Sequence, residues 1–327
     1  MPRRIGDLFE SVVSFHNLLG AARRAKRGCG ATREVCAFFY NLEPELLALR
    51  RELLSGSYAP GPYRYFTIYD PKVRTIAVAP FRDRVMHHAV VGVLTPIFEK
   101  RFIHDSYATR KGKGTHAAVL RSQTFLRRRP WFLKADIRKY FDSVDHSVLF
   151  SILERKIKDR RLLALLKKVT GDSLRLGKGL PIGNLTSQFL ANVYLDPLDH
   201  LVKERLRVKC YLRYMDDFVL FADAKVRLLE WRDAMEEFLS EKLKLGFKPG
   251  GVWLNRSSHG LSFLGMRVFP GVILLRGENR RRSVRRMRSR LRSWESGRMS
   301  EERLSSCLTS IVGWLRHFGT GLSLPGV

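Results

Sequence analysis

The tetrapeptide Tyr214–Asp217 places two adjacent acids between two apolar segments, Cys210–Arg213 and Phe218–Ala222. This pattern predicts a hydrophobic β-hairpin with Asp216 and Asp217 at its tip. Like charges repel and burial disfavours ionised groups, so such a pair costs free energy. A bound cation would remove that cost, and the hairpin is therefore expected to form part of a metal site. The alternative is that each acid caps an ordinary turn.

The chain carries a large excess of positive charge. Its 60 Lys and Arg residues against 31 Asp and Glu give a net charge of +29 over 327 residues. Such an excess indicates a polyanionic partner, and a nucleic acid backbone is the simplest one. Hydrophobic residues make up 45% of the chain. This is enough for a sizeable core and argues against a mainly disordered protein.

The chain shows no sign of a disulfide scaffold, a zinc site or a membrane segment. Its 4 cysteines have no CxxC spacing, so neither disulfides nor structural zinc are expected. The N-terminus is basic, but no apolar stretch follows it, and no run approaches the roughly 18 apolar residues of a membrane span. We therefore expect a soluble, cytoplasmic protein with no membrane partner.

Apolar periodicity divides the chain into helices and short strands. Residues 7–55 read as mostly helical, a β-hairpin is expected from strands at 65–68 and 75–79, and a helix follows over 82–99. A further helix is expected to carry Val144, Val148, Ile152 and Ile157. The remaining expected elements are strands at 131–135, 261–268 and 272–275, and helices at 226–243, beyond 280 and at 302–318. This mixture predicts an α+β protein.

Three acids are candidates for one metal site. Asp136 ends the buried strand at 131–135, and Asp216 and Asp217 lie at the end of another expected strand. If these strands are neighbours in one sheet, the carboxylates meet. Hard oxygen ligands of this kind suit Mg²⁺. Two such ions would hold the attacking and leaving oxygens of an in-line phosphoryl transfer.

Four motifs, in this order along the chain, resemble those of the reverse transcriptases. Thr75–Arg84 resembles the fingers motif, and Lys134–Asp142 resembles the first catalytic motif. Tyr214–Asp217 is similar to the second catalytic motif, and Phe263–Gly265 to the primer grip. The resemblance implies an α+β right-hand polymerase fold with fingers, a palm built on an antiparallel sheet, and a helical thumb. It also implies an RNA-directed DNA polymerase that uses dNTPs.

The resemblance assigns roles to the acids and boundaries to the regions. Asp136, Asp216 and Asp217 would be the catalytic carboxylates and, together with Ile137, the ligands of two Mg²⁺ ions, for which Mn²⁺ can substitute. The expected regions are an N-terminal helical extension with the start of the fingers at 1–64, fingers at 65–130, palm at 131–268 and thumb at 269–327.

The resemblance also implies a set of nucleotide contacts. Lys72 and Arg74 would bind the incoming triphosphate from the fingers hairpin, although either could be a solvated turn charge. Phe141 falls where the family places a steric gate against a ribose 2′-hydroxyl, and its alternative is an ordinary core residue. Ile182 and Gly183 would lie near the nascent base pair.

Further residues are expected to contact the template and primer. Three lie in the fingers motif and the primer grip, namely Arg82, Leu264 and Gly265. The others belong to a tract with nine Arg between positions 276 and 292, and they are Arg281, Arg285, Arg288 and Arg292. Contacts of this kind follow the phosphates and sugars of a duplex rather than its bases. The alternative for the Arg tract is a solvated basic face.

The segment Leu180–Gln188 narrows the resemblance. Ile182 and Gln188 replace the Gln and Pro of most reverse transcriptases, and this combination is similar to the enzymes of diversity-generating retroelements. That likeness implies a bacterial or phage-encoded enzyme that copies a template-repeat RNA into cDNA with errors at adenine, together with an accessory variability protein. Three alternatives stay open. Two are a group II intron and a retron-type reverse transcriptase; the third is a basic RNA-binding scaffold whose polymerase site is vestigial.

Overall fold

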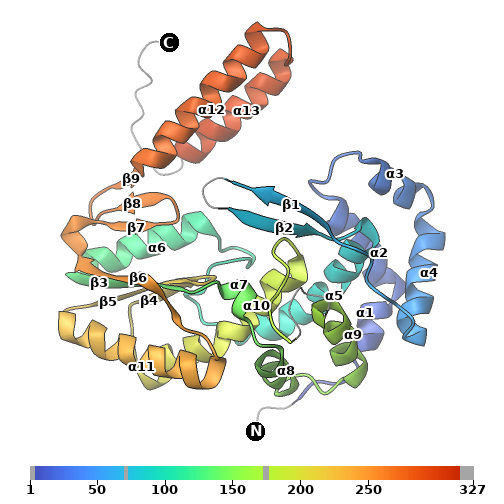
Figure 1. The fold of residues 1–327 in the computed structure, drawn as a ribbon, viewed down its shortest axis with the longest axis horizontal. Coiled ribbons are helices and arrows are strands. Elements are labelled where there is room, and N and C mark those ends of the chain that lie inside the picture. Colours follow the sequence, from blue (N-terminus) through green and yellow to red (C-terminus); the bar gives the residue numbers. More distant parts are fainter. Residues whose placement is uncertain (1–3, 70–72, 172–176, 317–327) are drawn as a thin grey trace.

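The computed structural model describes residues 4–69, 73–171 and 177–316. Figure 1 shows a group of helices and a hairpin on one side, a helix-covered sheet on the other, and two long helices that rise from the sheet region. Helices and antiparallel strands occur together, so the expected α+β class is confirmed. Among the described residues, no helix combines the length and the apolar character needed to cross a lipid bilayer.

The N-terminal helices pack around a long helix, α5 (Phe81–Glu99). They are α1 (Leu8–Val13), α2 (Phe15–Lys26), α3 (Arg33–Tyr40) and α4 (Leu42–Ser55). In α4, Leu46, Leu49 and Leu53 are buried because spacings of three and four residues place them on one face. The helical reading of residues 7–55 and the helix expected over 82–99 are confirmed.

The predicted fingers hairpin is present and projects from the body of the protein (Figure 1). It consists of β1 (Arg64–Ile68) and β2 (Arg74–Val78), which pair in antiparallel register. All of β1 is exposed, whereas Ala77 near the end of β2 is buried. The backbone N–H of Ala77 donates to the carbonyl of Ile182 at 2.8 Å. The base of the hairpin is therefore hydrogen-bonded to the turn that precedes α10 (Leu185–His200).

The central sheet is antiparallel, with strand order β4-β5-β3-β6. Its strands are β3 (Trp131–Ile137), β4 (Tyr211–Tyr214), β5 (Asp217–Ala222) and β6 (Phe247–Arg256). Successive side chains of a strand point to opposite faces, and both faces are buried here. Leu133 and Leu220 belong to one hydrophobic core, and Phe132 and Phe221 to the other.

Helices and a small sheet cover the two faces of the central sheet (Figure 1). One face packs against α10, which continues into the π-helical turn Leu201–Arg205, and against α11 (Lys225–Leu243). The other face contributes to the second core, shared with α6 (Thr115–Arg128) and the small sheet. That sheet follows the 3₁₀ turn Ser257–His259 and consists of β7 (Leu261–Phe263), β8 (Met266–Val268) and β9 (Ile273–Leu275).

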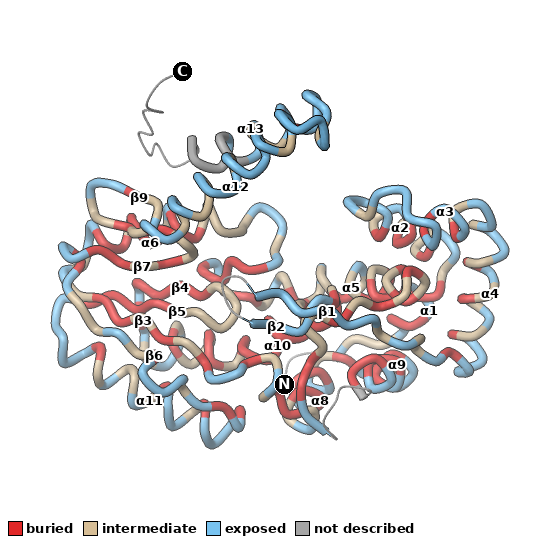
Figure 2. Tube along the Cα trace, turned by 45° about the horizontal axis from the view of Figure 1, so that its top comes forward, coloured by how far each residue is buried: buried red, intermediate tan, exposed pale blue. Residues whose placement is uncertain are grey.

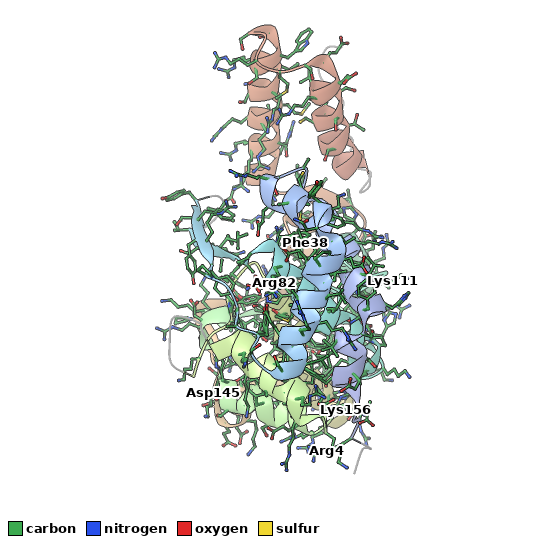
Figure 3. The ribbon with its side chains drawn as sticks, turned by 90° about the vertical axis from the view of Figure 1, so that its right-hand side faces the viewer. Arg4, Phe38, Arg82, Lys111, Asp145 and Lys156 are labelled. Carbon is green, nitrogen blue, oxygen red and sulfur yellow. The ribbon has the colours of Figure 1, made fainter. Side chains whose placement is uncertain are left out.

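The helix expected around Val144, Val148, Ile152 and Ile157 is confirmed as α8 (His146–Glu154), which contains Val148 and Ile152 and is flanked by Val144 and Ile157. The short helix α7 (Tyr140–Ser143) precedes it, and α9 (Arg160–Gly171) follows. The side chain of Asp145 accepts a hydrogen bond from the backbone N–H of Val148. This N-cap starts a new helix. Beyond α8, Ile157 forms an isolated bridge with Ile5, near Arg4 and Lys156, which lie together in Figure 3.

The edge strand β6 was not predicted from the sequence. Pro249, Gly250 and Gly251 lie inside it, and these residues usually mark turns. β6 is at the edge of the sheet and pairs only with β3 among the described strands, with a register shift between Ala135 and Ile137. Edge strands and bulges tolerate Pro and Gly because some backbone N–H groups need no partner there.

Two antiparallel helices, α12 (Gly277–Glu295) and α13 (Glu301–Arg316), form the expected thumb region. Val284, Leu291 and Trp294 of α12 remain 36–43% exposed, although α13 packs against α12. Figure 2 shows α12 exposed along its length. Its arginines are therefore open to solvent and available to a polyanion.

Candidate active site

Three carboxylates come together where β3 ends and β5 begins. Asp136 lies directly opposite Asp217 in the register of the two strands, and Cβ atoms at such positions are about 5 Å apart. Asp216 precedes Asp217 in the turn after β4. In this turn Met215 has a left-handed backbone, with φ 57°, which is uncommon for a residue other than glycine. The hairpin predicted from the sequence thus presents both of its acids beside Asp136.

Electrostatic repulsion is strong at this point. The pKa of Asp216 is raised to about 6, mainly by burial and then by the charges of Asp136 and Asp217, while Arg74 acts in the opposite direction. The site therefore holds more negative charge than its surroundings balance. A bound cation would relieve this repulsion.

The raised pKa of Asp216 predicts a pH-dependent stability in the absence of divalent ions. Its folded value of about 6 lies above the ordinary 3.8. The folded state therefore binds more protons between these values, and the contribution of Asp216 to stability falls as pH rises from about 4 to 6. We expect the melting temperature of Asp216→Asn, relative to the original protein, to rise over this range in a chelating buffer. A constant difference would contradict the prediction.

The donor chemistry of the site fits Mg²⁺. Carboxylate oxygens are its preferred protein ligands, and Ile137, whose side chain is buried, can offer a main-chain carbonyl. As the side chains stand, no group of three or more His, Cys, Asp or Glu within the described ranges is arranged to hold a metal ion. Asp217 is instead paired with Lys134, with 3.2 Å between Nζ and Oδ1.

The sequence motif contains Lys134 but did not indicate that its side chain pairs with a carboxylate of the site. Lys134 lies two residues before Asp136 on β3, so the two side chains share a face of the sheet. Its ammonium group lies 5.7 Å from the ring centre of Trp253 and 5.9 Å from that of Phe263, and it pairs with Asp217. The two-residue spacing between Lys134 and Asp136 was the sign in the sequence that both side chains lie on the same face of the strand.

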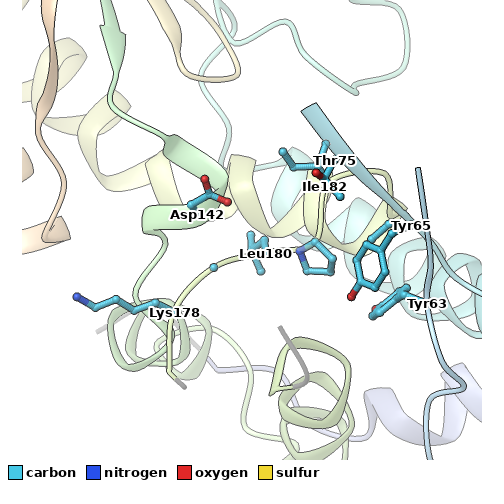
Figure 4. A pocket seen from close by; sticks show the side chains of 10 residues that line it. Tyr63, Tyr65, Thr75, Asp142, Lys178, Leu180 and Ile182 are labelled. Carbon is cyan, nitrogen blue, oxygen red and sulfur yellow. The ribbon is translucent and has the colours of Figure 1, made fainter. Parts of the chain in front are cut away.

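Ile182 and Gly183, two of the residues expected around the nucleotide, lie in the turn before α10, and Figure 4 shows Ile182 beside Thr75 of β2. Gly183 has φ 120°, and a Cβ atom there would lie 2.7 Å from the carbonyl oxygen of Ala77. Only glycine fits this backbone approach. Phe141 of α7 is joined to the same segment, because its carbonyl accepts a hydrogen bond from the backbone N–H of Leu180 at 2.7 Å. Ile182 and Gly183 are therefore held close to the fingers hairpin, and Phe141 close to Leu180.

Of the two cations expected to bind the triphosphate, Arg74 and Lys72, the structure describes only Arg74. Arg74 begins β2, is exposed, and lies close enough to Asp216 to lower the pKa of that carboxyl. Arg74 is therefore within electrostatic range of Asp216. Lys72 lies outside the described residues.

A buried ion pair lies beneath the carboxylate turn and was also missed. Arg213 is 0% exposed, and its Nε and Nη2 donate to both oxygens of Asp199 on α10 at 2.6–3.0 Å. Its Nη1 donates to the carbonyl of Met215 at 3.1 Å and to Oδ1 of Asn192 at 3.1 Å. Although burial lowers it, the charge of Asp199 raises the pKa of Arg213 above its usual value. The pair thus supports the left-handed turn from below.

Comparison with known proteins shows to which family this chain belongs. Residues 69–268, more than half of the chain, match the family described as reverse transcriptase (RNA-dependent DNA polymerase). The chain belongs to the reverse transcriptase family. Its helices and antiparallel sheets accordingly form a right-hand polymerase fold.

Two curated relatives align over about two thirds of the chain. Protein YkfC of Escherichia coli K12 is 28% identical over 273 residues, covering 69% of this chain and 72% of YkfC. The group II intron-encoded protein LtrA of Lactococcus lactis subsp. cremoris is 23% identical over 299 residues, covering 68% of this chain and 49% of LtrA. This chain therefore spans about half of LtrA. An apo telomerase structure from Candida tropicalis aligns with TM-score 0.49 and 12% identity over 69% of this chain and 58% of its own.

The motif that resembles a primer grip lies in the turn between β7 and β8. Leu264 and Gly265 both have positive φ, 47° and 85°. The carbonyl of Gly265 accepts hydrogen bonds from the backbone N–H of Arg276 at 3.2 Å and from Nδ2 of Asn279 at 2.9 Å. The turn is thereby tied to the start of α12. The four arginines expected to contact the duplex, Arg281, Arg285, Arg288 and Arg292, are exposed.

Arg82, which is expected to contact nucleic acid, forms an ion pair within the protein. Its Nη2 lies 2.6 Å from a carboxylate oxygen of Glu52 on α4, and Arg82 is labelled among the helices on the fingers side in Figure 3. The guanidinium therefore links α5 to α4 in this structure. Its sequence neighbourhood did not reveal Glu52 as a partner because the two residues lie 30 positions apart.

Proposed function

We propose that this chain extends a primer on an RNA template by adding dNTPs. The observation that carries the proposal is the convergence of Asp136, Asp216 and Asp217, within electrostatic range of Arg74, in a member of the reverse transcriptase family. The carboxylates and the carbonyl of Ile137 would hold two Mg²⁺ ions. When bound, these ions would favour ionisation of the primer 3′-hydroxyl and neutralise charge on the leaving pyrophosphate.

The protein groups around the carboxylates have separate tasks in this proposal. Arg74, together with Lys72, binds the triphosphate, since a cation near the leaving group stabilises its growing charge. Lys134 holds the carboxylate of Asp217 in place. Ile182 and Gly183 contact the nascent base pair, where Ile182 offers contact area without a hydrogen bond.

Phe141 is proposed to exclude the ribose 2′-hydroxyl. Its side chain is partly buried and packs beside Tyr140, with 5.6 Å between ring centres. We expect Phe141→Ala to raise incorporation of ribonucleotides relative to deoxynucleotides by about tenfold or more, because a removed steric contact no longer rejects the larger sugar. Single-nucleotide kinetics with matched rNTP and dNTP pairs would measure this. Unchanged discrimination, with normal dNTP kinetics, would return Phe141 to a packing role.

We propose four regions along the chain. Residues 1–64 form the helical extension and the start of the fingers, 65–130 the fingers, 131–268 the palm, and 269–327 the thumb. In this division the exposed arginines of α12 follow the backbone of the template-primer duplex. The primer grip, tied to α12 through Gly265, positions the primer end.

We further propose that the enzyme serves a diversity-generating retroelement and makes errors at template adenine. Ile182 and Gln188 support this subtype, and it implies a template-repeat RNA and an accessory variability protein as partners. The second candidate is a group II intron-type enzyme, which the similarity to LtrA favours.

Copying of a defined RNA with one adenine separates the two candidates. Frequent misincorporation opposite adenine, but not opposite the other bases, is expected for the first. Faithful copying at adenine would remove the diversity-generating assignment. Failure to incorporate any dNTP on RNA, with or without added RNA partners, would overturn the polymerase proposal itself and favour a vestigial RNA-binding scaffold.

A further inference from the structure

A cavity of about 230 Å³ opens between the fingers hairpin and the turn before α10 (Figure 4). Tyr63 and Tyr65 form one wall, and Leu180 lies at its floor. The cavity is smaller than the roughly 300–1,000 Å³ of pockets that enclose drug-sized ligands. Its size therefore suits a single flat ring system rather than a whole nucleotide.

The lining combines aromatic surface with polar groups of balanced charge. The ring centres of Tyr63 and Tyr65 are 6.2 Å apart, and Tyr65 is 46% exposed, so part of its ring is open for stacking. Thr75, Asp142 and Lys178 add a hydroxyl, a carboxylate and an ammonium group. Because the acid and the base offset each other, the cavity does not favour a phosphate or a triphosphate. A neutral nucleobase matches both the rings and the polar edge groups.

The cavity adjoins the place where the nascent base pair would form. Alternate residues of a strand point to the same face, so Thr75 and Ala77 share one face of β2, and both line the cavity. Tyr65 pairs with Ala77 across the hairpin and also lines the cavity. Ile182, which is proposed to contact the nascent base pair, lines the cavity as well. The cavity is therefore next to the templating position.

We propose that this cavity receives one unpaired base of the RNA template, the base immediately 5′ to the templating position. This inference rests on the proposed polymerase function, which requires a single-stranded template ahead of the site. The duplex leaves on the thumb side, whereas the cavity lies between the fingers hairpin and the turn before α10. Tyr65 stacks on the base, and Thr75, Asp142 and Lys178 hydrogen-bond to its edges. The cavity thus holds the next base apart until the template advances by one position.

The test is a binding experiment that does not require synthesis. A primer-template carries 2-aminopurine as the unpaired base, and a second, flush template ends at the templating position. On binding to the original protein we expect a change in 2-aminopurine fluorescence and about tenfold tighter binding of the overhanging template, which corresponds to stacking of one base. Tyr65→Ala should abolish both effects and leave binding of the flush template unchanged.

Phe66→Ala is the matched control. Phe66 is the next residue on β1, is 50% exposed, and does not line the cavity. This variant should keep the fluorescence change and the preference for the overhang. Equal weakening of both templates by Tyr65→Ala, or equal effects of the two variants, would overturn the proposal.

The experiment separates failure of the cavity from failure of the polymerase assignment. If dNTPs are incorporated normally on RNA and the 2-aminopurine signal does not depend on Tyr65, the cavity assignment is wrong. If the signal depends on Tyr65 but no dNTP is incorporated, base binding stands and the polymerase assignment falls.

Discussion

Asp216→Asn is expected to reduce Mg²⁺-dependent dNTP incorporation on an RNA template by about a thousandfold or more. A neutral amide keeps the shape of the side chain but removes a charged ligand from the site, and metal ions contribute several kcal/mol of transition-state stabilisation in such reactions. Asp217→Asn should have a similar effect. Single-turnover incorporation over a range of Mg²⁺ concentrations would measure the loss.

The loss at Asp216 should not come from unfolding. Because Asp216 is crowded by Asp136 and Asp217, its neutralisation relieves repulsion, and the variant should melt no lower than the original protein without divalent ions. Asp233→Asn, at an exposed acid of α11, is the matched control and should leave synthesis unchanged. Normal synthesis by Asp216→Asn would disprove the catalytic assignment.

The second large effect is expected at the buried pair beneath the turn. Arg213→Met leaves Asp199 as an uncompensated charge in the core, and breaking such a pair costs about 3–5 kcal/mol of unfolding free energy. Chemical denaturation would measure it. A loss below about 1 kcal/mol would show that the pair contributes little, because this is the range of exposed pairs.

A double variant separates stability from positioning. Arg213→Met combined with Asp199→Leu removes both charges, and replacing a buried pair by apolar residues is often neutral or stabilising. Most of the lost stability should therefore return. The carbonyl of Met215 would still lack its hydrogen bond from Arg213. We expect synthesis to remain about a hundredfold slower, because small displacements of reacting groups have effects of this size. Full activity of the double variant would contradict this role for Arg213.

The positions of Asp136, Asp216 and Asp217 were predictable because local sequence signals specify the strands that carry them. The apolar segments around Asp216 and Asp217 specify a hairpin, and the buried strand before Asp136 specifies a neighbour for it. Periodicity likewise predicted α5, α11 and the fingers hairpin. The apolar spacing that specifies each of them lies within one short segment of the chain.

Other features depend on partners far away in the sequence and were missed. Lys134 and Asp217 are 83 positions apart and meet only once β3 pairs with β5. Arg213 ends an apolar segment of the sequence, and only the packing of α10 brings its partner Asp199 against it. The strand β6 contains Pro249, Gly250 and Gly251, which usually favour a turn. Pairing with β3 at the edge of the sheet keeps this segment extended instead. In each case tertiary contact overrides local preference.

The double hydrogen bond at the carbonyl of Gly265 has a mechanical consequence. Since Arg276 and Asn279 both hold this oxygen, α12 cannot tilt without pulling on the turn between β7 and β8. A Cβ atom at Gly265 would lie 2.5 Å from Nδ2 of Asn279, so the turn and the start of α12 are closely packed. Any swing of the thumb helices is therefore transmitted to the turn that is expected to touch the primer end.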